Sequence, residues 1–266
     1  MIGAFIGDIV GSAYEFCNTK DYNFEIFKSG SSFTDDSIMT VAVARWLMED
    51  PGHTRKALCN IMEEQGHKYP CPVGGYGTMF NTWLHSADKT PYNSWGNGSA
   101  MRVSPVGWAF DTLEETERVA EMSASVTHNH PEGIKGAQAT AAAIWMARHG
   151  STREEIRSYI ETRFGYDLSR SWEYLHDTYD WEDSCQKTVP EAIIAFLEST
   201  DFEDAIRKAV SMGGDSDTIG AITGSIAEAF YGGVPDWMRA KAEEIFPEGA
   251  CDLLKEFMAF VSVPTV

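Results

Sequence analysis

The amino-acid sequence predicts an all-α fold, and two observations support this prediction. Apolar residues recur at helical spacing along most of the chain, whereas the strict alternation typical of β-strands is nearly absent. Alanine, the best helix former, is abundant and dominates residues 137–147 (AQATAAAIWMA). The chain should therefore fold as helices joined by loops.

The helical periodicity, read from the N-terminus onward, places helices at residues 2–16, 36–49, 53–66, 76–86, 113–124, 131–149, 152–163, 189–198, 202–211, 217–231, 236–245 and 250–260. Capping residues support three of the starts. Ser, Thr and Asp side chains precede 36–49 and 217–231, and Asn129 or His130 followed by Pro131 opens 131–149. No Pro-, Ser- or Gly-rich linker interrupts the sequence, so one domain over residues 1–266 is the simplest organisation.

Composition and charge exclude several classes of partner. A formal net charge of −19 repels nucleic acids and anionic membranes. No run reaches the roughly 18 apolar residues of a membrane span, and the N-terminus lacks the basic region of a signal peptide. The cysteines are scattered without metal-ligand spacing, which favours reduced thiols: Cys17, Cys59, Cys71, Cys185 and Cys251. We expect a soluble, cytoplasmic monomer.

Glycines recur every four residues in two of the predicted helices. Gly3, Gly7 and Gly11 form a stripe in the first, and Gly220 and Gly224 form one near the other end of the chain. An interior helical glycine costs about 1 kcal/mol relative to alanine, so close backbone packing must offset that cost. The two helices should pack together, or each stripe should accommodate a bulky neighbour.

Two acidic motifs, FTDDS at 33–37 and GGDSDT at 213–218, lie directly before the helices at 36–49 and 217–231. Each alone is a good helix N-cap. If the glycine stripes bring the helices together, Asp35, Asp36, Asp215 and Asp217 converge. Two unit charges about 4 Å apart repel by about 4 kcal/mol at an effective dielectric constant of about 20, so such a cluster needs cations. Oxygen ligands favour Mg²⁺, Mn²⁺ or Ca²⁺ over zinc.

Three further segments carry polar groups or flexible backbone, and each also has a purely structural interpretation. The run 94–102 (SWGNGSAMR) exposes backbone N–H groups, and its Arg102 could meet a phosphate or form a structural ion pair. The run 73–77 (VGGYG) could cradle a pyrophosphate or simply enter a helix. His128 and His130 lack the partners of a zinc site. Glu15, at the end of the first predicted helix, could be an ordinary surface carboxylate.

As a set, the motifs resemble the ADP-ribosylglycohydrolase family. The matching segments follow the family's order: GAFIGDIVGSAYEF, FTDDS, GNGSAMRVSP, SVTHNHPEGIKGA, TVPEAIIAFL and GGDSDTIGAITGSIAEAF. The resemblance implies a compact orthogonal bundle of helices with a centre of two Mg²⁺ ions, for which Mn²⁺ could substitute. It also implies the removal of ADP-ribose from modified protein side chains, with cleavage between C1″ of the ribose and the acceptor atom.

The resemblance assigns roles to particular residues. It implies metal binding by Thr34, Asp35, Asp36, Asp215, Asp217 and Thr218. Catalysis falls to Asp36 and Glu15, either of which could steer or deprotonate the attacking water. The implied substrate contacts are Gly75, Gly77, Ser94, Gly96, Asn97, Gly98 and His128.

Two positions depart from the family pattern and leave the acceptor open. Ser37 stands where Thr is usual but keeps the hydroxyl, whereas Trp95 replaces a tyrosine of some members and alters the wall of the cleft. ADP-ribosyl-arginine is the favoured substrate. ADP-ribosyl-serine, O-acetyl-ADP-ribose and poly(ADP-ribose) are alternatives, as are a non-catalytic ADP-ribose-binding protein and another metal-dependent phosphohydrolase.

Overall fold

The chain, described over residues 1–262 in a computed structural model, folds as helices around one continuous hydrophobic core. The helices are α1 (Ile2–Ser12), α2 (Asp35–Glu49), α3 (Arg55–Lys68), α4 (Thr78–Leu84), α5 (Gly98–Met101), α6 (Ser104–Ala109), α7 (Leu113–Ser125), α8 (Pro131–Arg148), α9 (Arg153–Phe164), α10 (Trp172–Thr178), α11 (Cys185–Leu197), α12 (Phe202–Ser211), α13 (Ser216–Tyr231), α14 (Asp236–Glu243) and α15 (Ala250–Val261). Within residues 1–262, the one β pairing is a bridge between Gly96 and Ser184. The predicted all-α class is confirmed.

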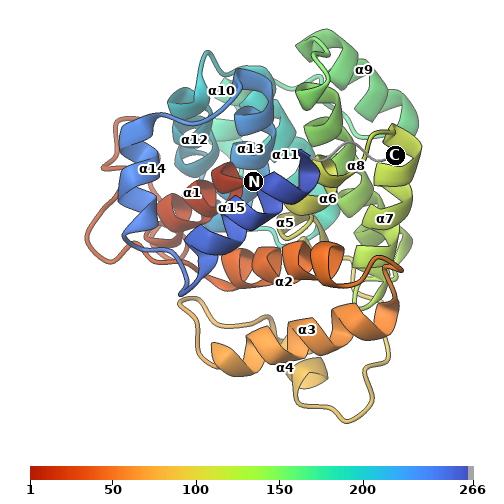
Figure 1. Cartoon of the computed structure of the whole chain (residues 1–266). Helices are drawn as coiled ribbons and strands as arrows, with labels where there is room; N and C mark the ends of the chain where they lie inside the picture. The colour runs from red at the N-terminus through yellow and green to blue at the C-terminus, as the bar shows by residue number, and fades with distance from the viewer. Residues whose placement is uncertain (263–266) are drawn as a thin grey trace.

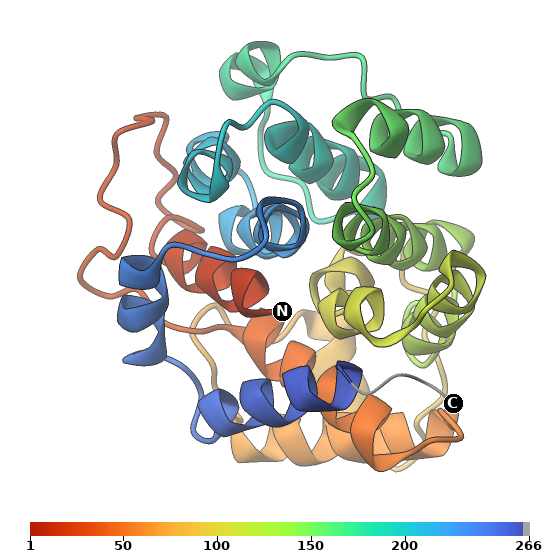
Figure 2. The same ribbon diagram turned by 45° about the horizontal axis from the view of Figure 1, so that its top comes forward.

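The centre of the fold is the pair α1 and α13, which lie side by side although they come from opposite ends of the chain (Figures 1 and 2). Every residue of α1 is buried. Helices α11 and α12 cover further sides of α13, and α8 also packs against it. Helix α2 packs beside α1, with α3 and α4 outside it (Figure 1). The acidic N-termini of α2 and α13 therefore belong to neighbouring elements.

The glycine stripes allow this contact because they remove the Cβ atoms between the two backbones. A Cβ built at Gly220 would lie 2.5 Å from the carbonyl oxygen of Gly7, and one at Gly7 would overlap the backbone of Gly220. Gly3 faces Gly224 in the same way, and Gly11 faces Ser216 and Asp217. The prediction that the two striped helices pack together is confirmed.

The first helix is shorter than the prediction of residues 2–16. It ends at Ser12, whose hydroxyl donates to Ile9 O (2.9 Å), and the amide of Tyr14 turns back to Gly11 O (2.8 Å). The side-chain amide of Asn18 then donates to the carbonyl oxygens of Tyr14 (2.7 Å) and Glu15 (2.9 Å), which would accept backbone N–H groups if the helix continued. Glu15 therefore lies in a turn beyond the helix and not at its end.

Other boundaries differ for local reasons. Helices α5, α6 and α10 were not predicted because four to seven residues are too few to display a 3.6-residue period. The helix predicted at 189–198 begins earlier, at Cys185, and keeps Pro190 inside it. Pro190 has no N–H to donate, so proline is usually found in the first turn of a helix. This preference placed the predicted start next to Pro190, at residue 189, which is too late. The helix predicted at 76–86 spans only Thr78–Leu84, after Gly77 as N-cap.

Of the helices in residues 1–262, none has the length and apolar character needed to cross a membrane.

Replacing Gly7 by alanine should destabilise the protein. Alanine favours a helix by about 1 kcal/mol, but its Cβ would overlap the Gly220 backbone, and overpacking of this kind costs about 3 kcal/mol. We expect a clearly lower free energy of unfolding in urea titrations followed by circular dichroism. Gly52→Ala is the control, since its nearest neighbour is a side-chain atom at 3.4 Å. Equal urea midpoints for Gly7→Ala and the unsubstituted protein would contradict this account of the helix contact.

Candidate metal centre

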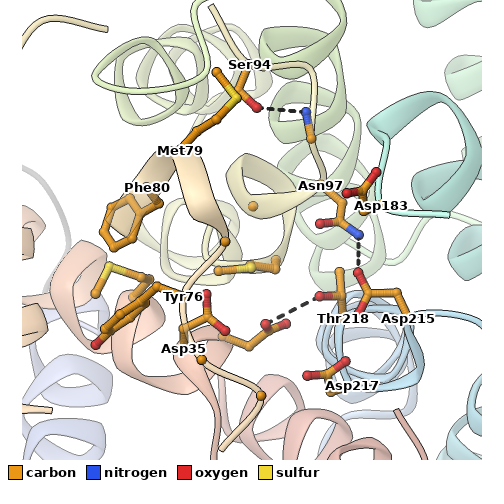
Figure 3. A pocket seen from close by; sticks show the side chains of 18 of the residues that line it. Asp35, Tyr76, Met79, Phe80, Ser94, Asn97, Asp183, Asp215, Asp217 and Thr218 are labelled. Atoms are coloured by element: carbon orange, nitrogen blue, oxygen red, sulfur yellow. Dashed lines mark hydrogen bonds between the residues drawn. The ribbon is translucent and has the colours of Figure 1, made fainter. Parts of the chain in front are cut away.

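One cavity of about 470 Å³ collects nearly all the predicted site residues. Its walls come from the turn after α1, the start of α2, the loop before α4, the segment around α5, the loop before α11 and the start of α13 (Figure 3). The predicted residues that line it are Glu15, Asp35, Asp36, Gly75, Gly77, Ser94, Gly96, Asn97, Gly98, His128, Asp215, Asp217 and Thr218. Thr34 is the exception, because it is fully buried beneath the cavity floor.

Asp8 of α1 fixes the first acidic motif in place. Its carboxylate is fully buried and accepts from Thr34 N (3.1 Å), Thr34 Oγ1 (2.8 Å), Ser37 N (3.1 Å) and Ser37 Oγ. It thus caps the N-terminus of α2 from a different helix, while Thr34 Oγ1 accepts the amide of Asp36 (3.2 Å). This double capping orients Asp35 and Asp36 relative to α1.

The second motif is held by side chains from two other segments. Asn97 donates its side-chain amide to Asp215 Oδ2 (2.7 Å) and to Thr188 Oγ1 (3.0 Å). Thr218 donates to Asp36 Oδ2 (3.3 Å), which links the two motifs directly. Figure 3 shows Asp215, Asp217 and Thr218 grouped on one side of the cavity, with Asp35 on the other.

Glu15 belongs to the acidic cluster. Carboxylate oxygens of Glu15, Asp215 and Asp217 all lie within 4.8 Å of one another. Asn18 fixes the turn that carries Glu15, because its amide donates to Gly214 O (2.9 Å) and its oxygen accepts from Gly214 N (2.9 Å). The interpretation of Glu15 as a surface carboxylate is wrong, since its side chain is buried in the cavity.

Burial and mutual repulsion raise the pKa values of these carboxyl groups. For Glu15, burial and the charges of Asp217 and Asp8 raise the pKa to about 8. Burial raises the pKa of Asp215 to about 6, against an opposing hydrogen bond from Asn97. Burial and the neighbouring carboxylates hold the pKa values of Asp35, Asp36 and Asp217 well above their usual range. The charged form of this cluster requires positive charge beside it.

The donor set fits a hard divalent cation. Three buried carboxylate oxygens in the cluster have no hydrogen-bond partner: Glu15 Oε2, Asp36 Oδ1 and Asp217 Oδ1. Buried acceptors without partners are costly, and oxygen-binding cations in this cavity would satisfy them. No histidine or cysteine takes part in the carboxylate cluster of the described chain, which favours Mg²⁺ or Mn²⁺ over zinc.

The segment 94–98 is anchored to the loop before α11. Asn97 N donates to Asp183 O (2.7 Å) and Cys185 N donates to Trp95 O (2.9 Å), forming the bridge between Gly96 and Ser184. Ser94 Oγ accepts from Gly96 N (3.0 Å). The segment predicted to expose backbone N–H groups is therefore a fixed wall of the cavity, and the Asn97 side chain positions Asp215 from that wall.

His128 and Arg102 are buried beside this wall, and both line the cavity. Burial and the Arg102 charge hold the pKa of His128 well below its usual range, so the imidazole is neutral. Arg102 is also buried and donates to Ser123 O (3.0 Å) and Thr127 Oγ1 (2.8 Å). Its guanidinium therefore bonds neutral oxygens, and the expected ion pair is not formed among the described residues.

The glycine run 74–77 forms an open edge of the cavity. Gly74 and Gly75 have left-handed φ angles of 79° and 81°, which side chains rarely adopt. A Cβ at Gly74 would also approach Glu15 Oε2 to 2.8 Å, whereas Gly75 and Gly77 face open space. The rings of Tyr76 and Phe80 pack beside them, with centroids 5.4 Å apart and planes tilted by 57°. The run thus combines exposed backbone with an aromatic wall.

Sequence reasoning missed two residues that organise the site. Asp8 is a charged residue inside an otherwise apolar, glycine-striped helix, and that mismatch signals a buried partner. Asn18 carries no comparable signal, because its partner Gly214 is remote in the sequence.

Comparison with known proteins gives consistent matches. A model of the ADP-ribosylglycohydrolase family matches residues 1–261. Human ADP-ribosylhydrolase ARH3 is 24% identical, over 87% of this chain and 84% of its own. ADP-ribosylarginine hydrolase Tri1 of Pseudomonas putida is 25% identical, over 91% of this chain and 73% of its own. The ADP-ribosyl-[dinitrogen reductase] glycohydrolase of Rhodospirillum rubrum is 25% identical, over 87% of this chain and 84% of its own.

A solved structure shares the fold. It is titled an ADP-ribosylglycohydrolase-related protein complex, with a TM-score of 0.72, 23% identity, and coverage of 98% of this chain and 93% of its own. An uncharacterised protein of Archaeoglobus fulgidus is 33% identical over 62% of this chain and 60% of its own. The family match spans both acidic motifs and the whole cavity wall. The chain therefore belongs to the ADP-ribosylglycohydrolase family of hydrolases.

Proposed function

We propose that the protein is a Mg²⁺-dependent hydrolase that removes ADP-ribose from modified protein side chains, with ADP-ribosyl-arginine as the favoured substrate. The observation that carries the proposal is the convergence of unpartnered, buried carboxylate oxygens in one cavity. Structural acidic residues would be satisfied by hydrogen bonds, as Asp8 is. Carboxylates left without partners in a cavity fit a cation that takes part in chemistry.

Two ions are proposed, with Mn²⁺ as a possible substitute. Asp35 and Asp36 would hold cations from the α2 side, and Asp215, Asp217 and Thr218 from the α13 side. Thr34, predicted as a ligand, would instead orient Asp36, because its hydroxyl already bonds Asp8 and the Asp36 amide. When bound, Mg²⁺ supplies charge neutralisation and Lewis-acid activation of a water molecule. Cleavage would pass through an oxocarbenium-like transition state: water adds to C1″ as the bond to the acceptor atom breaks, a carboxylate takes a proton from that water, and the departing acceptor atom takes up a proton.

Asp36 and Glu15 are the candidates for this proton acceptor. Both expose a free carboxylate oxygen at the acidic end of the cavity. Asp36 is fixed by Thr218 and by the start of α2, whereas Glu15 lies in the turn after α1 and can approach a bound sugar from the other side. Glu15 is the better proton acceptor once cations neutralise the aspartates, because it is not needed to join the two motifs.

The cavity also resolves the conflict between an anionic substrate and a protein with a net charge of −19. Cations at the carboxylates would reverse the local potential. The N–H groups of Gly77 and Gly98 are placed to meet phosphate or ribose oxygens, since the amides of Gly75, Gly96 and Asn97 already donate within the protein. The adjoining aromatic rings of Tyr76 and Phe80 provide an apolar wall.

We further propose that the protein acts as a monomer in the cytoplasm. The five cysteines are free thiols, which suits a reducing compartment.

The decisive experiment incubates the protein and Mg²⁺ with arginine-linked and serine-linked ADP-ribosyl peptides and measures free ADP-ribose. We expect faster release from the arginine-linked peptide. Preferential release from serine, from O-acetyl-ADP-ribose or from poly(ADP-ribose) would reassign the acceptor. Binding without release would indicate a non-catalytic ADP-ribose-binding protein, and release of phosphate would indicate a phosphohydrolase.

Removing the cations or a carboxylate should abolish release without unfolding the protein. EDTA should stop turnover reversibly, and Asp36→Ala and Asp217→Ala should fall to background in the same assay. Because each substitution relieves repulsion among buried carboxylates, neither variant should melt below the unsubstituted protein in EDTA. Full turnover in metal-free buffer would exclude the mechanism.

Glu15→Gln should separate turnover from binding. The amide keeps the shape of the side chain but cannot accept a proton, so kcat should fall about 100-fold while KM changes less than about threefold. Steady-state kinetics on the arginine-linked peptide measure both constants. The exposed Glu256→Gln serves as the matched control. An unchanged kcat would remove Glu15 from the reaction.

A further inference from the structure

Two large aromatic side chains are exposed at the mouth of the cavity. Phe16 is 73% and Trp181 44% exposed, and both also line the cavity. Their rings stack with centroids 5.8 Å apart and planes at 21°, although they come from distant parts of the sequence. Exposed apolar surface gathered at a binding cavity indicates a contact with a ligand or partner.

The two aromatic residues are held in position by polar bonds beneath them. Asn18 ties the turn that carries Phe16 to Gly214. Lys20 donates to the carbonyls of His176 (2.6 Å), Tyr179 (3.3 Å) and Met212 (2.7 Å), so the segment before Trp181 is joined to the same turn. The stacked pair is therefore built into the site.

The surroundings of the pair are acidic. Asp180, Glu182 and Asp183 flank Trp181, and Asp183 lines the cavity (Figure 3). Lys20 is the cation close by, and its ammonium group is engaged by three carbonyls. Aromatic faces beside carboxylates attract a planar cation, and a guanidinium group both stacks on rings and forms paired hydrogen bonds with carboxylates.

We propose that Phe16, Trp181 and Asp183 form the acceptor subsite, and that its ligand is the guanidinium group of an arginine-linked ADP-ribosyl peptide. Phe16 directly follows Glu15, so the pair borders the acidic end of the cavity where the scissile bond would lie. A serine acceptor offers no cation to this surface. The inference rests on the proposed hydrolysis and explains its preference for arginine.

Kinetics on the two peptides test the subsite. Trp181→Ala and Phe16→Ala should lower kcat/KM for the arginine-linked peptide about tenfold, the size of a cation–π contact, and leave the serine-linked peptide and the Kd of free ADP-ribose unchanged. Tyr174→Ala is the control, being 56% exposed and outside the cavity. Equal losses for both peptides, or none, would overturn the proposal.

A binding measurement separates this proposal from the hydrolysis itself. In an Asp217→Ala background, which lacks turnover but keeps the aromatic pair, Trp181→Ala should weaken calorimetric binding of the arginine-linked peptide about tenfold. An unchanged Kd would refute the acceptor subsite even if the protein hydrolyses the peptide. If the unsubstituted protein binds and does not hydrolyse, the proposed reaction fails while the subsite stands.

A second inference comes from the hydrogen bonds behind the cavity wall. Arg102 Nη2 donates to Thr127 Oγ1 (2.8 Å), which lies 2.7 Å from His128 Nδ1. Arg102 occupies one lone pair of the Thr127 oxygen, and we infer that the Thr127 hydroxyl donates its hydrogen to Nδ1, which lies at hydrogen-bond distance. Nδ1 is then an acceptor, and the ring hydrogen of this neutral imidazole resides on Nε2.

The Nε2 atom faces the cavity wall at its glycines. A Cβ built at Gly98 would lie 3.1 Å from Nε2, and one at Gly96 would lie 3.7 Å away. We infer that Arg102 and Thr127 are positioning residues that fix the tautomer of His128, so that Nε2–H donates to a substrate oxygen at this glycine segment.

Nitrogen-15 NMR of the His128 ring tests the tautomer directly. We expect the Nε2–H form in the unsubstituted protein and a mixture of tautomers in Thr127→Val, with kcat/KM about tenfold lower for the loss of one directed hydrogen bond. Thr140→Val is the matched control, since Thr140 is buried and its hydroxyl has no partner. An Nδ1–H form in the unsubstituted protein, or an unaltered tautomer in Thr127→Val, would overturn the inference. If Thr127→Val does not fold, the first spectrum still decides.

Discussion

Backbone contact between α1 and α13 is the constraint on which the rest of the structure depends. Glycine on both faces lets the helices meet without side chains between them. Asp8 projects from α1 to cap α2, Asp217 projects from α13, and Glu15 follows α1 directly. A wider separation of the two helices would move all three carboxylates at once. The site is therefore set by the distance between two backbones more than by any single bond.

This geometry concentrates buried carboxyl groups, and keeping them charged lowers the stability of the folded protein. Burial alone raises the pKa of most of these carboxyl groups, and their proximity raises several of them further. The protein offsets part of this with directed donors such as Asn97 and Thr218. It leaves oxygens of Glu15 and Asp217 without partners. A bound cation would relieve the repulsion that these hydrogen bonds do not remove, and this relief would contribute to the affinity for the cation.

The sequence predicted contacts correctly where a residue pattern carries an energetic cost that only those contacts offset. Five glycines inside helices are costly unless the two helices pack together. Once the helices are expected to pack, the aspartate pairs at their N-termini are expected to converge. Asn18 and Lys20 could not be predicted, because each binds backbone carbonyls or amides far away in the chain, which leave no pattern in side-chain types. The end of α1 was misplaced for the same reason, since Asn18 captures the carbonyls that would have extended it.

The pairing of Gly7 with Gly220 also has a consequence for how the protein is made. Contacts between residues so distant in the sequence form late, because a long intervening chain must first be ordered. During synthesis α1 emerges first and remains without its partner until α13 has left the ribosome. An apolar, glycine-striped helix must stay unaggregated through that interval. The carboxylates of Glu15 and Asp217 come together only when α1 and α13 have met, so a nascent chain carries no assembled cation site.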